Sequence, residues 1–189
     1  SDVYKRQDAG FTRKIAPMSS LFDPLVIRGV TLKNRIGMSP MCMFSSKRGF
    51  VTDFHRVHYP TRAAGGCGLI IVEATAVEPR GVIAPNDLGI WTDDHVDGLR
   101  DVVRLIRAHG ATPAIQLAHA GRKAGSYEID DAGNSAIDVV GPSAIAFEPR
   151  RPTPRELGVA ELAEVRDAFV AGARRAIEAG FEVIELHLS

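Results

Sequence analysis

The sequence of 189 residues is poor in cysteine and has no surplus of charge of either sign. Only Cys42 and Cys67 are present, so a framework of structural disulfides is not expected, and a reducing compartment, the cytoplasm, is the default. Lys plus Arg and Asp plus Glu number 23 each, which gives a formal net charge of zero. Because proteins that bind nucleic acid or anionic membranes usually carry a basic surplus, neither is expected as a partner.

Long hydrophobic runs are absent as well. The most apolar stretch, 68–77 (GLIIVEATAV), contains Glu73 and is too short to span a bilayer. No apolar run near the N-terminus resembles a signal peptide. The composition, 45% hydrophobic and 24% charged residues, is that of an ordinary globular domain with enough apolar material for a core.

The two ends of the sequence look foreign to the rest. Back-translated, residues 2–7 (DVYKRQ) fit the end of a transposase adapter used to prepare sequencing libraries, and 188–189 (LS) fit its start on the other strand. We therefore expect 1–17 and 188–189 to be non-native, and 18–187 to be part of a longer protein. A natural disordered tail is the alternative for 1–17.

Apolar, β-prone runs alternate with helical patterns along the chain. The runs cover 35–41, 67–77, 112–118 and 182–187. Near-continuous apolar stretches of this length are typical of strands buried on both faces of a parallel sheet. Helices are predicted over 53–64, 92–109 and 160–179. This alternation indicates a parallel α/β fold.

Local signals mark where the helices begin, end and pack. Thr92 can cap the second helix, and Gly110 and Gly180 can end the second and third. Pro60 is expected to kink the first helix or split it after Tyr59. The apolar stripes are predicted to be Val96, Leu99, Val103 and Ile106 in the second helix, and Leu162, Val165, Phe169, Ala173 and Ala176 in the third.

One connection is much longer than the others. Residues 121–158, about 38 in number, are rich in Gly and Pro and separate the third strand from its helix. A loop of that length in a compact domain usually covers a site or is disordered.

Four strand–helix units fit either a doubly wound sheet or half of an eight-stranded barrel. A dinucleotide-binding doubly wound fold predicts a Gly-x-Gly-x-x-Gly turn after its first strand, whereas here that strand is followed by 42–50 (CMFSSKRGF). Each run ends instead in distinctive polar or sulfur-containing residues, and barrel enzymes collect their chemistry at such strand ends. The sequence therefore predicts the N-terminal half, about four strands, of a (β/α)8 barrel.

The residues at the strand ends suit a flat heteroaromatic ligand. Met41 and Cys42 are soft and polarizable. Gln116 can present a donor and an acceptor together to an imide-like edge. Ala74 is small enough to let a ring approach the backbone, and His187 can donate to a substrate oxygen or titrate near neutral pH. Together they predict a site for a planar cofactor with a substrate laid on its face.

Four motifs at these strand ends, SPMCM (39–43), GLIIVEATAV (68–77), IQLAHAGRK (115–123) and IELH (184–187), resemble the Old Yellow Enzyme family of flavin-dependent ene-reductases. The resemblance is greatest to the bacterial, thermophilic-like branch, and it covers 18–187. It implies a barrel that binds FMN and is reduced by NADPH or NADH. The reduced flavin then passes a hydride to the β-carbon of an α,β-unsaturated carbonyl compound. Whether the longer parent protein is a homo-oligomer is left open.

Carried over residue by residue, the resemblance implies a set of ring-binding residues: Ser39, Pro40, Met41, Cys42, Ala74 and Gln116. Cys42 would tune the redox behaviour of the flavin. His187 would be the first of two residues, three apart, that hold the carbonyl oxygen of the substrate, where charge develops. Phe44 stands where this branch often has tyrosine, so it would meet the substrate without a hydroxyl. The second of the two residues and a tyrosine proton donor would lie beyond 187.

Other candidates have simpler interpretations. Cys67, Met38 and Met43 are expected to be structural. His55 and His58 are spaced HxxH, but no further Cys or His completes a tetrahedral set, so no metal site is expected.

Two carboxylates and two cations near the strand ends are also singled out. Glu73 and Glu185 are expected to hold neighbouring backbone or an arginine. His119 and Arg122 could reach either the flavin or the long loop.

Two other functions stay open. A larger iron–sulfur flavin barrel, related to 2,4-dienoyl-CoA reductase or amine dehydrogenase, would carry its cluster cysteines beyond residue 189. A non-catalytic truncated fragment would expose the edges of its outer strands. We expect the 189-residue chain alone to bind FMN weakly or not at all.

Overall fold

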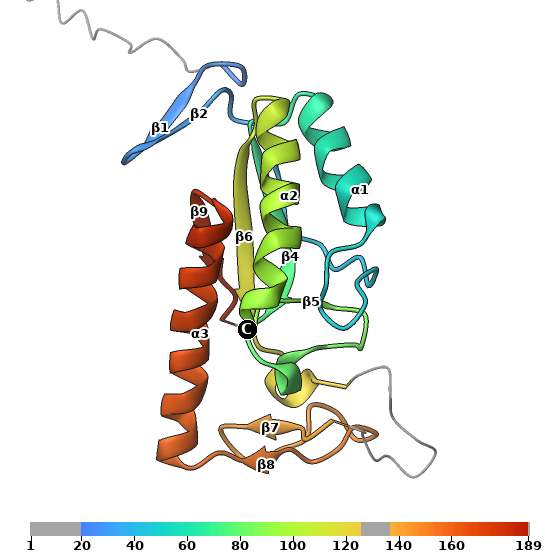
Figure 1. Cartoon of the computed structure of the whole chain (residues 1–189). Helices are drawn as coiled ribbons and strands as arrows, with labels where there is room; N and C mark the ends of the chain where they lie inside the picture. The colour runs from blue at the N-terminus through green and yellow to red at the C-terminus, as the bar shows by residue number, and fades with distance from the viewer. Residues whose placement is uncertain (1–19, 126–136, 189) are drawn as a thin grey trace, which may run out of the picture.

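The computed structural model describes residues 20–125 and 137–188, so the expectations for 1–17 and Ser189 lie outside the described residues. The fold is built on a parallel sheet. Its strands are adjacent in the order β3 (Gly37–Met38), β4 (Leu69–Ala76), β6 (Thr112–Ala118) and β9 (Val183–Leu186), and β5 (Leu88–Gly89) pairs with the end of β4. The prediction of a parallel α/β fold is confirmed (Figure 1).

The three predicted helices follow the strands in turn. They are α1 (Asp53–Ala64), α2 (Val96–Ala108) and α3 (Val159–Ala179), and α2 packs between the other two (Figure 1). No helix among the described residues is long and apolar enough to cross a membrane.

Each predicted strand is present. β6 coincides with the predicted run, and β4 and β9 fall within theirs. The first strand is much shorter than its predicted run 35–41, because only Gly37 and Met38 pair with β4. Pro40 has no N–H to donate to a ladder, so the chain leaves the sheet before it. The residues predicted to bind a cofactor therefore lie on irregular backbone.

The helices also differ in detail from the predictions. α1 continues through Pro60 without a split, and the buried Pro60 ring packs in the core side of the helix, which offsets the lost backbone bond. Thr92 precedes a short 3-10 turn, η2 (Asp93–His95), and the α-helix starts only at Val96. Gly110 (φ 72°) and Gly180 (φ 101°) take the left-handed conformation expected at helix ends.

The apolar stripes explain how α2 and α3 pack. All four stripe residues predicted for α2 are buried, and full burial of a Leu or Ile contributes about 1.5–3 kcal/mol. In α3 the prediction for Leu162 was wrong, since it is 44% exposed. The prediction for Ala176 is confirmed, since it is buried together with Gly172 and Ala179, and Phe169 and Ala173 pack against the core as predicted. A Cβ at Gly172 would lie 3.0 Å from Val77, so the small residue permits a close helix–sheet approach.

The core joins one face of the sheet to the helices. Ile70, Val72, Ile115 and Leu117 supply the strand side, and all four are fully buried. Met38 is buried in the same cluster, and Cys67 packs against it, as expected for structural residues.

The long connection is only partly irregular. Within its described residues it contains η3 (Gly121–Lys123) and the parallel pair β7 (Val140–Gly141) and β8 (Arg155–Glu156). These two-residue strands are too short to give a sequence signal. Of the two expectations for this connection, that it covers a site or is disordered, the described part supports the first, since Lys123 lines the pocket at the strand ends. A further 3-10 turn, η1 (Pro79–Gly81), follows β4.

A hairpin that the sequence did not indicate precedes the sheet. β1 (Leu25–Ile27) and β2 (Val30–Leu32) pair antiparallel, with Arg28 at φ 53° in the turn. The hairpin lies at the end of the sheet where the parallel strands begin, opposite the end where they finish (Figure 1).

Candidate functional site

The site is built where the parallel strands end, and strand register brings its residues together. Ala74 of β4 is the Cα partner of Gln116 of β6, which is in turn the partner of Glu185 of β9. The backbone N–H of His187 donates to the carbonyl of Leu117 at 2.9 Å. Side chains of register partners in a parallel sheet share one face. The expectation that these strand ends converge is therefore confirmed in space.

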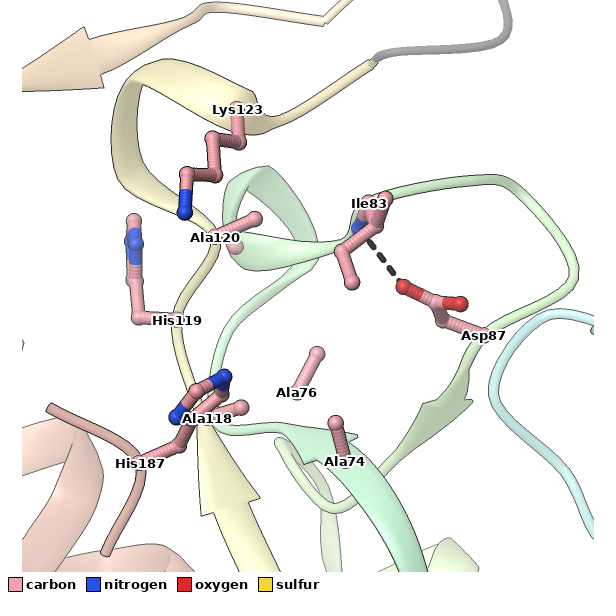
Figure 2. Close-up of a pocket in the computed structure, with 10 residues that line it drawn as sticks. Ala74, Ala76, Ile83, Asp87, Ala118, His119, Ala120, Lys123 and His187 are labelled. Atoms are coloured by element: carbon pink, nitrogen blue, oxygen red, sulfur yellow. Dashed lines mark hydrogen bonds between the residues drawn. The ribbon is translucent and has the colours of Figure 1, made fainter. Parts of the chain in front are cut away.

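A pocket opens at this mouth (Figure 2). Its lining residues come from the ends of β4, β6 and β9 and from the segments that follow them: Ala74, Ala76, Gly81, Ile83, Asp87, Ala118, His119, Ala120, Lys123 and His187. The pocket volume is about 50 Å³, well below the ~300 Å³ or more of a typical cofactor site.

The segment 39–44 borders Ala74 on the side away from His187. Ser39 is exposed, Pro40 is half-buried, and the apolar Met41 side chain is 52% exposed. Phe44 adopts φ 49°, a left-handed conformation that is strained for a residue other than glycine. This segment is not part of the pocket lining. It forms a separate flank of the same mouth.

Cys42 lies half-buried on this flank, with backbone hydrogen bonding from Ala74. Burial, with the negative charges of Asp87 and Glu73, raises the pKa of the Cys42 thiol to about 11. At neutral pH the side chain is therefore a neutral thiol and not a nucleophilic thiolate.

Gln116 is held by a side chain of the neighbouring strand. Its Nε2 donates to Glu185 Oε1 at 2.5 Å, and Gln116 is only 8% exposed. The expectation that Glu185 holds backbone or an arginine was wrong, because register places the two side chains on one face. The bond fixes which end of the amide is the donor and which is the acceptor.

His119 and Arg122 separate into different roles. His119 Nε2 donates to Glu78 Oε1 at 2.6 Å, while its Nδ1 accepts the Gly121 N–H at 2.9 Å, so the ring proton lies on Nε2. The His119 ring lines the pocket beside His187 (Figure 2). Arg122 reaches the long loop, where it stacks 5.8 Å over the Phe147 ring.

Glu78 anchors this side of the mouth. It accepts hydrogen bonds from His119 and from Arg80 Nε, each at 2.6 Å. Burial pushes the pKa of Glu78 upward, but the two hydrogen bonds outweigh it, and the net pKa is lowered. The carboxylate is thus stabilised as a fixed acceptor.

Asp87 is a pocket residue that sequence reasoning missed. It is 3% exposed, and its Oδ2 accepts the N–H of Ile83 at 2.6 Å and of Ala84 at 3.3 Å. Burial raises the pKa of Asp87 to about 6. The single acidic residue in the largely apolar run 82–90 was the signal that could have identified it.

A buried polar network behind the mouth was also missed as a unit. Glu73 is fully buried and binds both Tyr59 and the backbone of Met43, which confirms that it holds neighbouring backbone. His55 and Tyr59 are four apart in α1 and therefore share the helix face toward β4. That spacing was the available signal. No group of three or more metal-binding side chains is found in 20–125 and 137–188.

Comparison with known proteins decides the family. The model of the NADH:flavin oxidoreductase / NADH oxidase family matches residues 20–189. The chain belongs to this family. Old Yellow Enzymes are among the solved structures that share its fold, so the resemblance seen in the motifs is confirmed.

Two relatives show how this chain compares with other members of the family. An NADPH dehydrogenase of Geobacillus sp. (strain WCH70) is 54% identical over 169 residues, which are 88% of this chain and 47% of that one. The structure of the Old Yellow Enzyme homologue from Zymomonas mobilis superposes with a TM-score of 0.76 at 31% identity, covering 89% of this chain and 48% of the other. The chain thus spans about half the length of the relatives it matches, and its sheet corresponds to part of their barrel.

A larger protein shares the fold at lower sequence identity. A 2-naphthoyl-CoA reductase structure has a TM-score of 0.78 at 26% identity, and the match covers 88% of this chain but only 26% of that protein. The identity to the NADPH dehydrogenase is about twice as high. The chain is therefore more similar to the shorter relatives.

Proposed function

We propose that the chain is the N-terminal half of an FMN-dependent NADPH dehydrogenase of the ene-reductase type. The observation that carries this is the register of three strands, which aligns Ala74, Gln116 and His187 at one mouth beside Cys42. The NADPH dehydrogenase relative, at 54% identity, supports the choice of reductant.

The residues at the mouth fit a flavin ring. Ser39, Pro40 and Met41 form one flank, and the exposed Met41 thioether offers a polarizable surface for an aromatic face. Ala74 lets the ring approach the backbone. The Gln116 amide, held by Glu185, offers oriented donor and acceptor groups to the pyrimidine edge. When bound, FMN would supply the hydride, and the chain would supply its orientation.

His187 would hold the carbonyl oxygen of an α,β-unsaturated substrate. Its exposed side chain stands at the pocket mouth and can donate a hydrogen bond where negative charge develops. Removing one such donor typically costs about 10²–10³-fold in kcat. Phe44, which directly follows Met43, would add an apolar contact where the related branch often has a tyrosine hydroxyl.

Cys42 would act as a thiol beside the ring. With a pKa of about 11 it brings no negative charge to the mouth at neutral pH. A neutral, polarizable group favours a flavin that accepts and gives electrons without forming a covalent adduct. Both cysteines are free, and we place the enzyme in the cytoplasm, with small molecules as its partners.

The chain by itself would not complete the site. β9 is the last strand of the described sheet, and its residue Leu186 is 52% exposed. We therefore expect the 189-residue chain alone to bind FMN weakly, as the fragment alternative holds. The lower identity to the larger 2-naphthoyl-CoA reductase makes the iron–sulfur alternative the second candidate.

A chimera tests this function directly. Residues 18–187 would be joined to the C-terminal half of the Geobacillus NADPH dehydrogenase, which is 54% identical over the shared part. We expect a yellow protein with stoichiometric FMN that oxidises NADPH with cyclohex-2-enone as acceptor. A folded chimera, judged by circular dichroism, that binds no flavin would refute the proposal.

A His187→Ala variant of the chimera assigns the role of that residue. FMN should stay bound, while binding of a phenol, seen as a long-wavelength absorbance band, weakens at least tenfold. The matched control is His109→Ala, since His109 lies at the far end of α2, away from the mouth. Loss of flavin from the His187 variant would show that this residue binds the cofactor instead.

A further inference from the structure

Glu73 is a fully buried carboxylate directly behind the mouth, and its place in β4 is irregular. The register between β4 and β6 shifts between Val72 and Ala74, so Glu73 is the extra residue of a β-bulge. Its backbone N–H does not join the ladder but donates to the Tyr59 hydroxyl at 3.1 Å. Bulges often re-aim a side chain next to an active site.

The two oxygens of this carboxylate have separate partners. Oε1 accepts the Tyr59 hydroxyl at 2.9 Å, and Oε2 accepts the backbone N–H of Met43 at 2.8 Å. Tyr59 therefore donates to and accepts from the same residue, which fixes the Glu73 side chain. The fixed carboxylate in turn fixes the Met43 amide, one residue after Cys42.

His55 and Thr52 tie the same region from the other end. The Thr52 N–H donates to His55 Nδ1 at 3.0 Å, so the ring proton lies on Nε2, which faces Glu73 Oε1 at 3.4 Å. At that distance the contact is electrostatic rather than a well-formed hydrogen bond. Thr52 Oγ1 donates to the Ser45 carbonyl at 2.8 Å.

The segment between these anchors is strained. Phe44 lies in the left-handed region at φ 49°, which costs about 1–3 kcal/mol and persists only where surrounding contacts enforce it. Met43 on one side and Ser45 on the other are the residues that the network holds. The network therefore has the arrangement needed to keep Cys42 in place against Ala74.

A neutral hydrogen-bond acceptor could hold the Met43 amide equally well, so the anchoring alone does not explain the negative charge of Glu73. Burying a carboxylate is costly even when it is hydrogen-bonded. Cys42 interacts with Glu73 from β4, with Asp87 from the residues before β5, and with Tyr59 from α1, while His55 of α1 faces Glu73. The two carboxylates both disfavour a thiolate at Cys42.

We propose that Glu73 is a positioning residue that fixes segment 41–44 through the Met43 amide, and that its carboxylate adds to burial and to Asp87 in disfavouring a thiolate at Cys42. The link to catalysis rests on the proposed function, because only a flavin at this mouth would make the state of Cys42 matter for hydride transfer. The anchoring and the effect on the thiol do not depend on FMN, and the tests below use the 189-residue chain without it.

Thiol reactivity measures the effect of the charge. In a Cys67→Ser background, Cys42 is the only cysteine, and its iodoacetamide alkylation is followed by mass spectrometry from pH 7 to pH 11. Glu73→Gln removes the charge but keeps an acceptor for the Met43 amide. We expect alkylation at pH 9 to become at least about threefold faster, which corresponds to half a pKa unit. Glu78→Gln removes a carboxylate on the other side of the mouth and should leave the profile unchanged.

Amide hydrogen exchange measures the anchoring. Glu73→Ala removes the acceptor, and we expect the Met43 amide to exchange at least about tenfold faster, consistent with the loss of a hydrogen bond to a charged group. Glu73→Gln should change this rate less than Glu73→Ala does. Amides in α2 serve as the internal reference, since the hydrogen bonds of the Glu73 carboxylate go to Met43 and Tyr59 and not to that helix.

Two results would overturn the proposal. One is a Glu73→Gln alkylation profile equal to that of the parent. The other is a Met43 amide that stays equally protected in a folded Glu73→Ala variant. If Glu73→Ala does not fold, the Glu73→Gln profile alone decides. A chimera that binds no flavin would refute the proposed function and leave both of these measurements unaffected. A failure of the proposed function can therefore be told apart from a failure of the proposal for Glu73.

Discussion

The carboxylate of Asp87 makes the stability of this protein depend on pH in a direction that can be worked out. Its pKa rises from 3.8 to about 6 on folding, chiefly because the side chain is 3% exposed. At 1.36 kcal/mol per pKa unit, ionised Asp87 costs at most about 3 kcal/mol. The native state holds this proton more tightly than the unfolded chain does. The contribution to stability is therefore full below about pH 4 and is lost as the pH rises through about 6.

An Asp87→Asn substitution removes this dependence. The Asn oxygen can still accept the Ile83 and Ala84 amides, whereas its NH2 group adds buried donors at a cost that does not vary with pH. The difference in unfolding free energy between Asn and Asp should therefore shift in favour of Asn by up to about 3 kcal/mol from pH 4 to pH 8. Urea unfolding of both proteins across this range measures it, and Asp138→Asn, at an exposed position, is the control. A difference that stays constant with pH, or shifts the other way, would refute the reasoning.

Two further predictions concern packing. Leu99→Ala, at a fully buried position of α2, should lower the free energy of unfolding by about 2–5 kcal/mol, whereas Leu162→Ala, 44% exposed on α3, should change it by less than about 1 kcal/mol in the same denaturation assay. Gly68→Ala should destabilise by about 1–3 kcal/mol, because its Cβ would lie 2.7 Å from the Asn34 carbonyl oxygen, and Gly65→Ala, whose φ of −68° suits alanine, is the control. Equal effects within either pair would contradict the packing described.

The parts of the fold that follow from the sequence are those with long, strongly patterned signals. β6 is a continuous apolar run that is buried throughout, and α2 buries apolar residues on a helical period, so hydrophobic pattern alone locates them. The short strands β5, β7 and β8 have two residues each, and their pairing depends on neighbours far away in the chain. The hairpin of β1 and β2 exposes Val26 and Ile27, so it lacks a one-sided burial pattern.

The candidate site divides in the same way. The residue types at the strand ends were readable, because parallel strands deliver them to one edge. The bond between Gln116 and Glu185 was not, since it depends on a register that no local signal specifies. Asp87 was missed for a related reason: it follows an irregular turn, where residue spacing does not give the direction of a side chain.

The bulge in β4 gives this strand two halves of opposite parity. Val72 pairs with Ile115 and faces the helices, yet Ala74, two residues later, pairs with Gln116 and lines the mouth. In an unbroken strand, residues two apart would point the same way. If residue 73 took a regular place in the ladder, Ala74 would pair with Leu117 and turn toward α2, and Thr75 would point into the mouth. The bulge therefore decides which residues of β4 line the site and which pack in the core.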